Sequence, residues 1–178
     1  MVTDDNTTTG APQSLRTTGQ PDGEPADVML ARFLLGSTAA QTAASLLRDG
    51  AEVAVTFTDV AGEWRFYSDA AKPAMEPGKA QDPDFELRLA PGAVRSICSM
   101  PDANIGELGI AFFEHVVSRE PDYRIRVQLH SGLIKLTRRG WLGLLARGGP
   151  NLAGWMAKKG FRGSSAVVAA LARLKSSR

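Results

Sequence analysis

The sequence has few of the residues that most catalytic and metal-binding sites need. Its 178 residues include one cysteine, Cys98, and two histidines, His115 and His130. One cysteine excludes an internal disulfide framework and a cysteine-rich zinc site, and it fits a reducing cytoplasm. The glycine-rich fingerprints of nucleotide sites and the Gly-x-Ser-x-Gly elbow of hydrolases are also missing. We therefore expect no catalysis, no metal and no cofactor, and we interpret Cys98 as a small apolar side chain.

Long hydrophobic runs are missing as well. No apolar stretch reaches the ~18–20 residues that cross a bilayer, and residues 1–24 lack the apolar centre of a signal peptide. These first residues are rich in Thr, Gly, Pro and Asp, which predicts a disordered leader. The apolar content of 43% and charged content of 22% then predict a packed core in the rest of the chain.

Acidic residues stop at Asp122. From residue 123 to the end there are twelve Lys or Arg and no Asp or Glu, although the net charge of the whole chain is only +2. This asymmetry predicts that the last third of the chain faces an anionic partner, either a membrane surface or a nucleic acid. A solvated basic face that only aids solubility is the plain alternative.

Hydrophobic periodicity predicts helices at both ends of a run of strands. We expect one helix from Asp27, as its N-cap, to Gly36, and a second from Ser37 or Thr38 to Arg48. Further helices are expected after Pro91, over 108–118 and beyond Trp141. Alternating segments predict strands over 53–58, 63–67, 74–76, 84–90, 123–130 and around Ile134 and Leu136. This order predicts an α+β fold with a mostly antiparallel sheet of five or six strands covered by helices.

Large apolar side chains are the most abundant candidates for a functional site. Phe57, Trp64, Phe66 and Phe85 share one face of the expected strands, and Phe112 and Phe113 lie on an apolar helix. Their plain interpretation is an ordinary core. Taken together, they also fit an apolar tunnel for an acyl chain or a sterol. The acidic pair Asp82 and Asp84 is interpreted as solvated turn charges.

Four segments resemble the sterol carrier protein type two domain, over about Val53 to Leu145. They are Gly62–Glu63–Trp64 after the first strand, the Asp82–Leu89 strand, Ala111–Phe112–Phe113, and Gly132–Leu136 followed by an apolar helix at Trp141–Leu145. The resemblance implies a five-stranded sheet around a hydrophobic tunnel, with non-covalent binding or transfer of a sterol, fatty acyl chain or phospholipid. It implies a tunnel lined by Phe57, Trp64, Phe66, Phe85, Leu87, Ile97, Phe112, Phe113, Val116, Ile134 and Leu136.

We divide the chain into a leader over 1–24, a lipid-binding domain over 25–147 and a basic helical extension over 148–178. The basic region interleaves cations with tryptophan and other apolar residues, which favours docking on an anionic membrane. The residues expected to face the membrane are Arg138, Arg139, Trp141, Trp155, Lys158, Lys159 and Phe161. The sequence thus predicts a cytoplasmic protein, peripheral to a membrane, whose partner is a hydrophobic small molecule. A protein-interaction or nucleic-acid-binding module is the alternative, with nucleic acid less favoured because no long basic recognition helix is seen.

Overall fold

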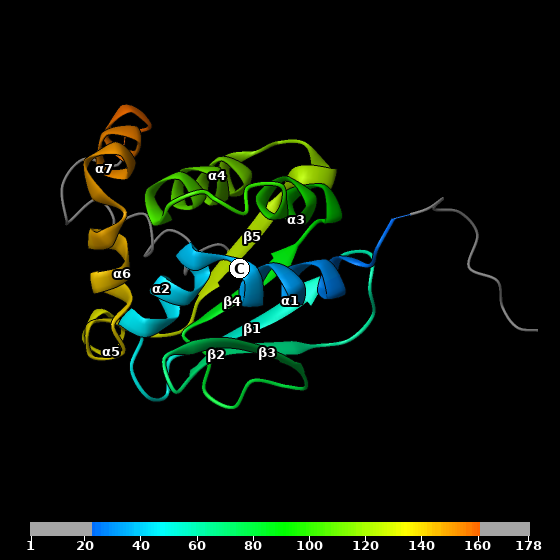
Figure 1. The fold of residues 1–178 in the computed structure, drawn as a ribbon, viewed down its shortest axis with the longest axis horizontal. Helices are drawn as coiled ribbons and strands as arrows, with labels where there is room; N and C mark the ends of the chain where they lie inside the picture. The colour runs from blue at the N-terminus through cyan, green and yellow to red at the C-terminus, as the bar shows by residue number, and fades with distance from the viewer. Residues whose placement is uncertain (1–22, 161–178) are drawn as a thin grey trace, which may run out of the picture.

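The computed structural model describes residues 23–160 and shows an α+β fold (Figure 1). The expected fold class and the mostly antiparallel sheet are confirmed. The helices of this part are α1 (Ala26–Gly36), α2 (Thr38–Leu46), α3 (Pro91–Cys98), α4 (Ile105–Val117), α5 (Leu133–Arg138), α6 (Trp141–Arg147) and α7 (Gly149–Lys158). The strands are β1 (Glu52–Phe57), β2 (Trp64–Asp69), β3 (Lys72–Pro77), β4 (Phe85–Leu89) and β5 (Ile125–Leu129), and a short 3-10 helix (Pro121–Tyr123) precedes β5.

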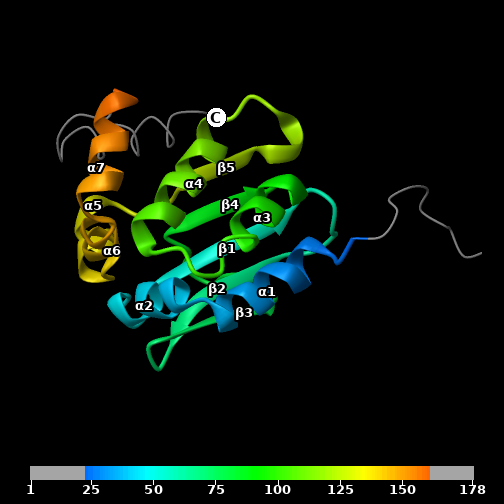
Figure 2. The same cartoon turned by 45° about the horizontal axis from the view of Figure 1, so that its top comes forward.

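The five strands form one mixed sheet in the order β3-β2-β1-β4-β5. The central pair β1–β4 is parallel, and the other three pairs are antiparallel. Helices α1, α3 and α4 lie over one face of this sheet, and α5, α6 and α7 gather at one end of it (Figures 1 and 2). The two edges of the sheet are therefore β3 and β5.

The strand register gathers the apolar side chains on the face that the helices cover. Val55 on β1 lies opposite Trp64 on one side and Leu87 on the other, and directly paired residues share a face. The same register adds Val53, Phe57, Phe66, Met75, Phe85 and Val127 to that face. The shared face that strand alternation predicted is thus present.

The opposite face of the sheet carries charged and polar side chains. Arg65 on β2 forms an ion pair with Glu76 on β3, and the Tyr67 hydroxyl donates to the same carboxylate at 3.2 Å. The Arg65 guanidinium holds the pKa of Glu76 below its usual range by hydrogen bonding to the carboxylate. One face of the sheet is therefore built for the core and the other for water.

Two helix starts test the capping predictions. The Ser37 side chain accepts from the backbone N–H of Ala40 at 3.3 Å, which confirms it as the N-cap of α2. The expectation that Asp27 caps α1 is wrong, because the cap is Pro25 and Asp27 lies inside the first turn. The N-terminus of α1 therefore has no side-chain cap.

The expected sixth strand around Ile134 and Leu136 is a helix, α5. The chain turns after β5 because the backbone N–H groups of His130 and Ser131 both donate to the carbonyl of Asp84. The α5 helix then buries Leu136 to 2% exposure and leaves Ile134 80% exposed. Two apolar residues at alternate positions fit one turn of a helix as well as a strand, so periodicity alone does not decide so short a segment.

Asp84 is fully buried, so the interpretation of this residue as a solvated turn charge is wrong. Its carboxylate accepts from Nη1 of Arg139 at 2.8 Å, from Nε1 of Trp141 at 2.7 Å and from the Ser131 hydroxyl. These donors come from the end of α5, the start of α6 and the end of β5. One buried carboxylate therefore fastens the helical hairpin α5–α6 to the sheet.

A second set of contacts holds the same hairpin from outside. Asp82 accepts from Lys135 at 2.6 Å and from Nη2 of Arg139 at 2.8 Å, and both cations hold its pKa below the usual range. The turn between α5 and α6 passes so close to α2 that a Cβ on Gly140 would lie 2.1 Å from the carbonyl oxygen of Leu46. Gly140 also has a φ of +90°, so both space and conformation require glycine there.

The α7 helix packs on the body of the domain through its apolar side. Leu152 and Met156 are buried, and the rings of Phe113 on α4 and Trp155 on α7 lie 6.3 Å apart. The division at residue 148 stays a prediction, but the part of the extension that the structure describes contacts α4. Residues 1–22 of the predicted leader and residues 161–178 of the predicted extension lie outside the described residues.

We expect Asp84→Ala to lower the free energy of unfolding by about 3–5 kcal/mol, the usual cost of removing one partner from a buried ion pair. The Trp141 indole N–H would lose its acceptor, and Arg139 would keep only its contacts with Asp82. Urea denaturation of the purified protein measures this loss. The matched control is Asp82→Ala, whose side chain is 65% exposed and whose loss should be much smaller. Equal losses in the two variants would contradict the anchoring role.

Candidate functional site

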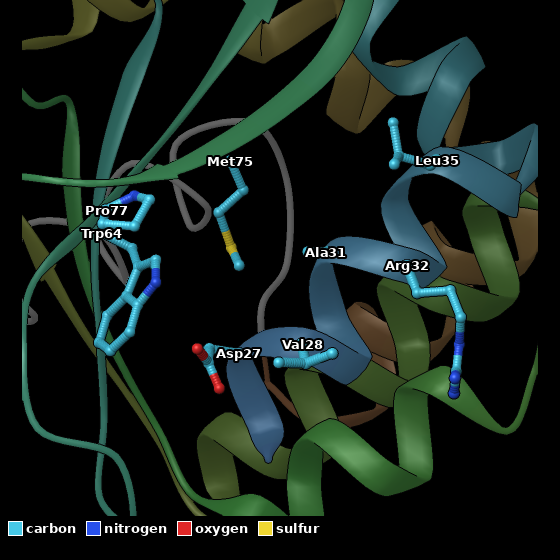
Figure 3. Close-up of a pocket in the computed structure, with 8 residues that line it drawn as sticks. All are labelled: Asp27, Val28, Ala31, Arg32, Leu35, Trp64, Met75 and Pro77. Carbon is cyan, nitrogen blue, oxygen red and sulfur yellow. The ribbon is translucent and has the colours of Figure 1, made fainter. Parts of the chain in front are cut away.

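A groove of about 450 Å³ lies between α1 and the strands β2 and β3 (Figure 3). It is open to solvent along one side and is lined mainly by apolar side chains. The lining residues are Asp27, Val28, Ala31, Arg32, Leu35, Trp64, Met75 and Pro77. Its volume falls within the range of small-ligand sites, but it is an open groove and not an enclosed cavity.

The floor of the groove belongs to the edge of the sheet. Trp64 on β2 pairs with Pro77 on β3, and Met75 is two residues away on the same face. The Trp64 ring packs edge-on against Phe57, with centroids 5.0 Å apart. Trp64 and Phe57 both belong to the buried core, so the indole is held in place where the core borders the groove.

The wall of the groove is one side of α1. Val28, Ala31 and Leu35 follow one another at helical spacing, so they lie along one stripe of the helix. Val28 is 48% exposed and Leu35 is 69% exposed, which is high for large apolar side chains. The stripe is thus apolar but only partly covered by the rest of the molecule.

Two charged side chains line this groove, and they differ in whether they have a partner within the protein. Arg32 forms a two-point ion pair with Glu24, with its nitrogen atoms 2.6 and 2.9 Å from the two carboxylate oxygens. Asp27 has a buried oxygen, Oδ1, with no hydrogen-bond partner among the described residues. Figure 3 shows the Asp27 carboxylate on the same side of α1 as Trp64, whereas the Arg32 side chain extends away from Met75 and Trp64.

Of the residues expected to line a tunnel, Trp64 lines this groove. Phe57 is buried in the core beneath it. Phe66, Phe85, Leu87, Ile97, Phe112 and Val116 are half-buried and pack against the core between the sheet and the helices. Phe113 contacts Phe112 and Trp155 instead, with centroid distances of 5.5 and 6.3 Å. Ile134 and Leu136 lie on α5, at the end of the sheet. The tunnel under α4 stays a prediction.

The residues expected to face a membrane divide into two groups. Arg139 is paired with two aspartates, and Trp141 donates to Asp84 and packs edge-on against Phe85 at 5.0 Å, so both hold the fold together. The expectation that Arg139 and Trp141 face a membrane is wrong, because both side chains are directed at partners within the protein. Arg138, Lys158 and Lys159 are exposed, and Trp155 is half-buried with the Lys159 ammonium 5.7 Å from its ring. Phe161 lies outside the described residues.

Sequence reasoning missed the α1 wall and Met75. Val28, Ala31 and Leu35 follow helical spacing in the sequence, but Met29 and Phe33 form a second apolar side of the same helix. Met29 packs against the core. An α1 that is apolar on a second side is the signal that could have indicated the groove.

Neither a metal site nor a membrane-spanning helix is found within residues 23–160. No group of three His, Cys, Asp or Glu side chains in this range is arranged to hold a metal ion. The helices in the same range are all too short or too polar to cross a bilayer.

Comparisons with known proteins give a likeness to solved structures but no family. No protein-family model matches the chain, and no curated protein matches it. A solved structure described as "UbiJ-SCP2 Ubiquinone synthesis protein" is 17% identical and aligns with 70% of this chain and 89% of its own, with a TM-score of 0.39. The resemblance to the sterol carrier family therefore stays a prediction.

Cys98 should react slowly with thiol reagents in the folded protein. Burial raises the pKa of its thiol to about 11, and its Sγ lies 3.8 Å from the carbonyl oxygen of Met29. The thiolate is the reactive form, so little of it exists at neutral pH. We expect labelling by a disulfide reagent at pH 7.5 to be slow in buffer and to become fast in denaturing urea. Equally fast labelling in both conditions would contradict the apolar role of Cys98.

Proposed function

We propose that this protein binds a hydrophobic small molecule without catalysis, in the groove between α1 and β2–β3. The observation that carries the proposal is the apolar groove itself, with Trp64, Met75 and Pro77 as its floor and a half-exposed apolar stripe of α1 as its wall. A stripe of this kind costs free energy in water, and an apolar ligand removes that cost by covering it. The groove lining holds one carboxylate, Asp27, and no Ser, Thr, Cys, His or Lys beside it, so a nucleophile–base pair is missing there, which supports binding rather than chemistry.

The size of the groove suits part of a lipid chain. Each buried methylene contributes about 0.8 kcal/mol, so about ten of them offer the free energy of a micromolar Kd before the costs of association. The groove is open on one side, so the rest of a longer ligand can extend into solvent. A single acyl or isoprenoid-like chain fits these limits better than a polar metabolite does.

Filling the groove should abolish binding. We expect Ala31→Phe to weaken the Kd of a fluorescent long-chain probe at least about tenfold, because the new ring occupies space that the ligand needs. Fluorescence titration gives the Kd, and thermal unfolding shows that the variant is folded.

The matched control is Ala153→Phe, the same change at an exposed position on α7. It should bind the probe like the original protein. An unchanged Kd in a folded Ala31→Phe variant would place the ligand elsewhere, with the half-buried layer under α4 as the next site to test.

We further propose that the C-terminal helices dock on an anionic membrane through α5. A patch on α5, defined by Leu133, Ile134 and Arg138, supports this proposal: all three are exposed, and Ile134 and Arg138 share a face at i, i+4 spacing. Exposed apolar side chains next to cations are typical of interfacial membrane helices. Arg147, Lys158 and Lys159 add exposed positive charge on α6 and α7, the helices that gather with α5 at this end (Figure 1). The proposed location is thus peripheral to a membrane.

Ile134→Asp should reduce sedimentation with vesicles that contain anionic phosphatidylglycerol by about fivefold or more, since burying an isoleucine contributes ~1.5–3 kcal/mol. Ile134 is exposed, so the fold should not change. The control is Val117→Asp, an equally drastic change at another exposed apolar residue, on α4. Binding should be weak to neutral phosphatidylcholine vesicles and should fall with salt. Tight binding to duplex DNA without vesicle binding would instead favour a nucleic-acid module.

A further inference from the structure

We infer that Asp27 makes the groove selective for amphiphiles whose head group donates a hydrogen bond, a hydroxyl or an ammonium, over those that end in a carboxylate. This inference rests on the proposed function, because it names the head group of the ligand that the apolar groove would hold. Asp27 is the acidic residue among the groove-lining residues, and its neighbours in the lining are mostly apolar.

The structure gives Asp27 too few partners of its own. Its Oδ1 is buried and has no hydrogen-bond partner among residues 23–160. A buried acceptor without a donor is unfavourable, and such atoms are rare in folded proteins. The carboxylate lies on the Trp64 side of α1 (Figure 3), so a donor on the head of a ligand would supply the missing partner once it displaces the side-chain atoms that now cover Oδ1.

The position of Asp27 in the first turn of α1 does not account for this arrangement. A carboxylate there gains from the helix dipole, and it commonly accepts from free backbone N–H groups. Other helices of this protein make such bonds: Ser37 caps α2, and Asn104 and Glu107 form a capping box on α4. No side chain caps α1, so the Asp27 carboxylate is free of that role.

The nearest cation in the lining is already neutralised. Arg32 is held by Glu24 through both of its terminal nitrogens, and its side chain points away from Trp64 and Met75 (Figure 3). A ligand carboxylate would therefore meet the negative charge of Asp27 without a free guanidinium to offset it. A hydroxyl or an ammonium meets an acceptor instead, and an ammonium also gains from the opposite charge.

Three ligands with the same chain and different heads test the inference. Dodecylammonium, dodecanol and dodecanoate are titrated at pH 7 against a bound fluorescent probe, below their micelle concentrations, with the original protein, Asp27→Asn and Asp27→Ala. We expect the original protein to bind dodecylammonium at least about tenfold more tightly than dodecanoate. In Asp27→Asn this ratio should fall to about twofold, because the charge is gone.

The alcohol separates charge from hydrogen bonding. Asparagine keeps an acceptor oxygen and alanine does not, so dodecanol should bind Asp27→Asn as it binds the original protein and should bind Asp27→Ala several-fold more weakly. The matched control is Asp49→Asn, which removes an exposed carboxylate outside the groove lining and should leave all three affinities unchanged.

The outcomes distinguish the two proposals. Equal affinities for the three heads in every variant would overturn the role of Asp27 and leave the groove as an apolar site. Preference for dodecanoate in the original protein would overturn it as well. Failure of all three ligands to displace the probe, together with an unchanged probe Kd in Ala31→Phe, would overturn the proposed function and this inference with it.

Discussion

The arrangement of the C-terminal half depends on one buried carboxylate. Asp84 loses its hydration completely, so its charge has to be balanced by donors from the protein itself. The structure places Arg139, Trp141 and Ser131 around it, and in doing so fixes where β5 ends and where α5 and α6 lie. Part of the positive charge that the sequence concentrates after Asp122 is therefore used inside the molecule.

This anchoring separates a structural use of the basic region from an external one. Arg139 and Lys135 face the acidic residues just before β4, whereas Arg138 is exposed on the same side of α5 as Ile134. Arg138 and Arg139 are adjacent in sequence, yet one is exposed to solvent and the other is ion-paired inside the protein. Successive positions on a helix are turned about 100° from each other, so they point in different directions. Net charge along the sequence does not show this division.

Sequence patterns predicted the strands and helices better than the contacts between elements that are distant in the chain. Alternation in β1, β2 and β4 gave the correct apolar face, and the cap of α2 was narrowed to Ser37 or Thr38, because both signals are local. The burial of Asp84 and the helix at Ile134 could not be predicted, because each depends on residues about fifty positions away in the chain. Within the candidate site, the aromatic pattern indicated Trp64. The α1 wall was missed since a helix with two apolar sides gives no sign of which one the core will cover.

The edge position of β3 has a consequence for how this protein behaves in solution. An open sheet edge can pair with a strand of another molecule and begin aggregation. In β3, Pro73 and Pro77 have no N–H to donate, and Lys72 begins the strand with a charge. The other edge strand, β5, carries the exposed Arg126 between its buried residues, and Arg124 lies just before it. Both borders of the sheet thus disfavour strand addition, so the apolar groove can lie open at the β3 edge without an unprotected strand beside it.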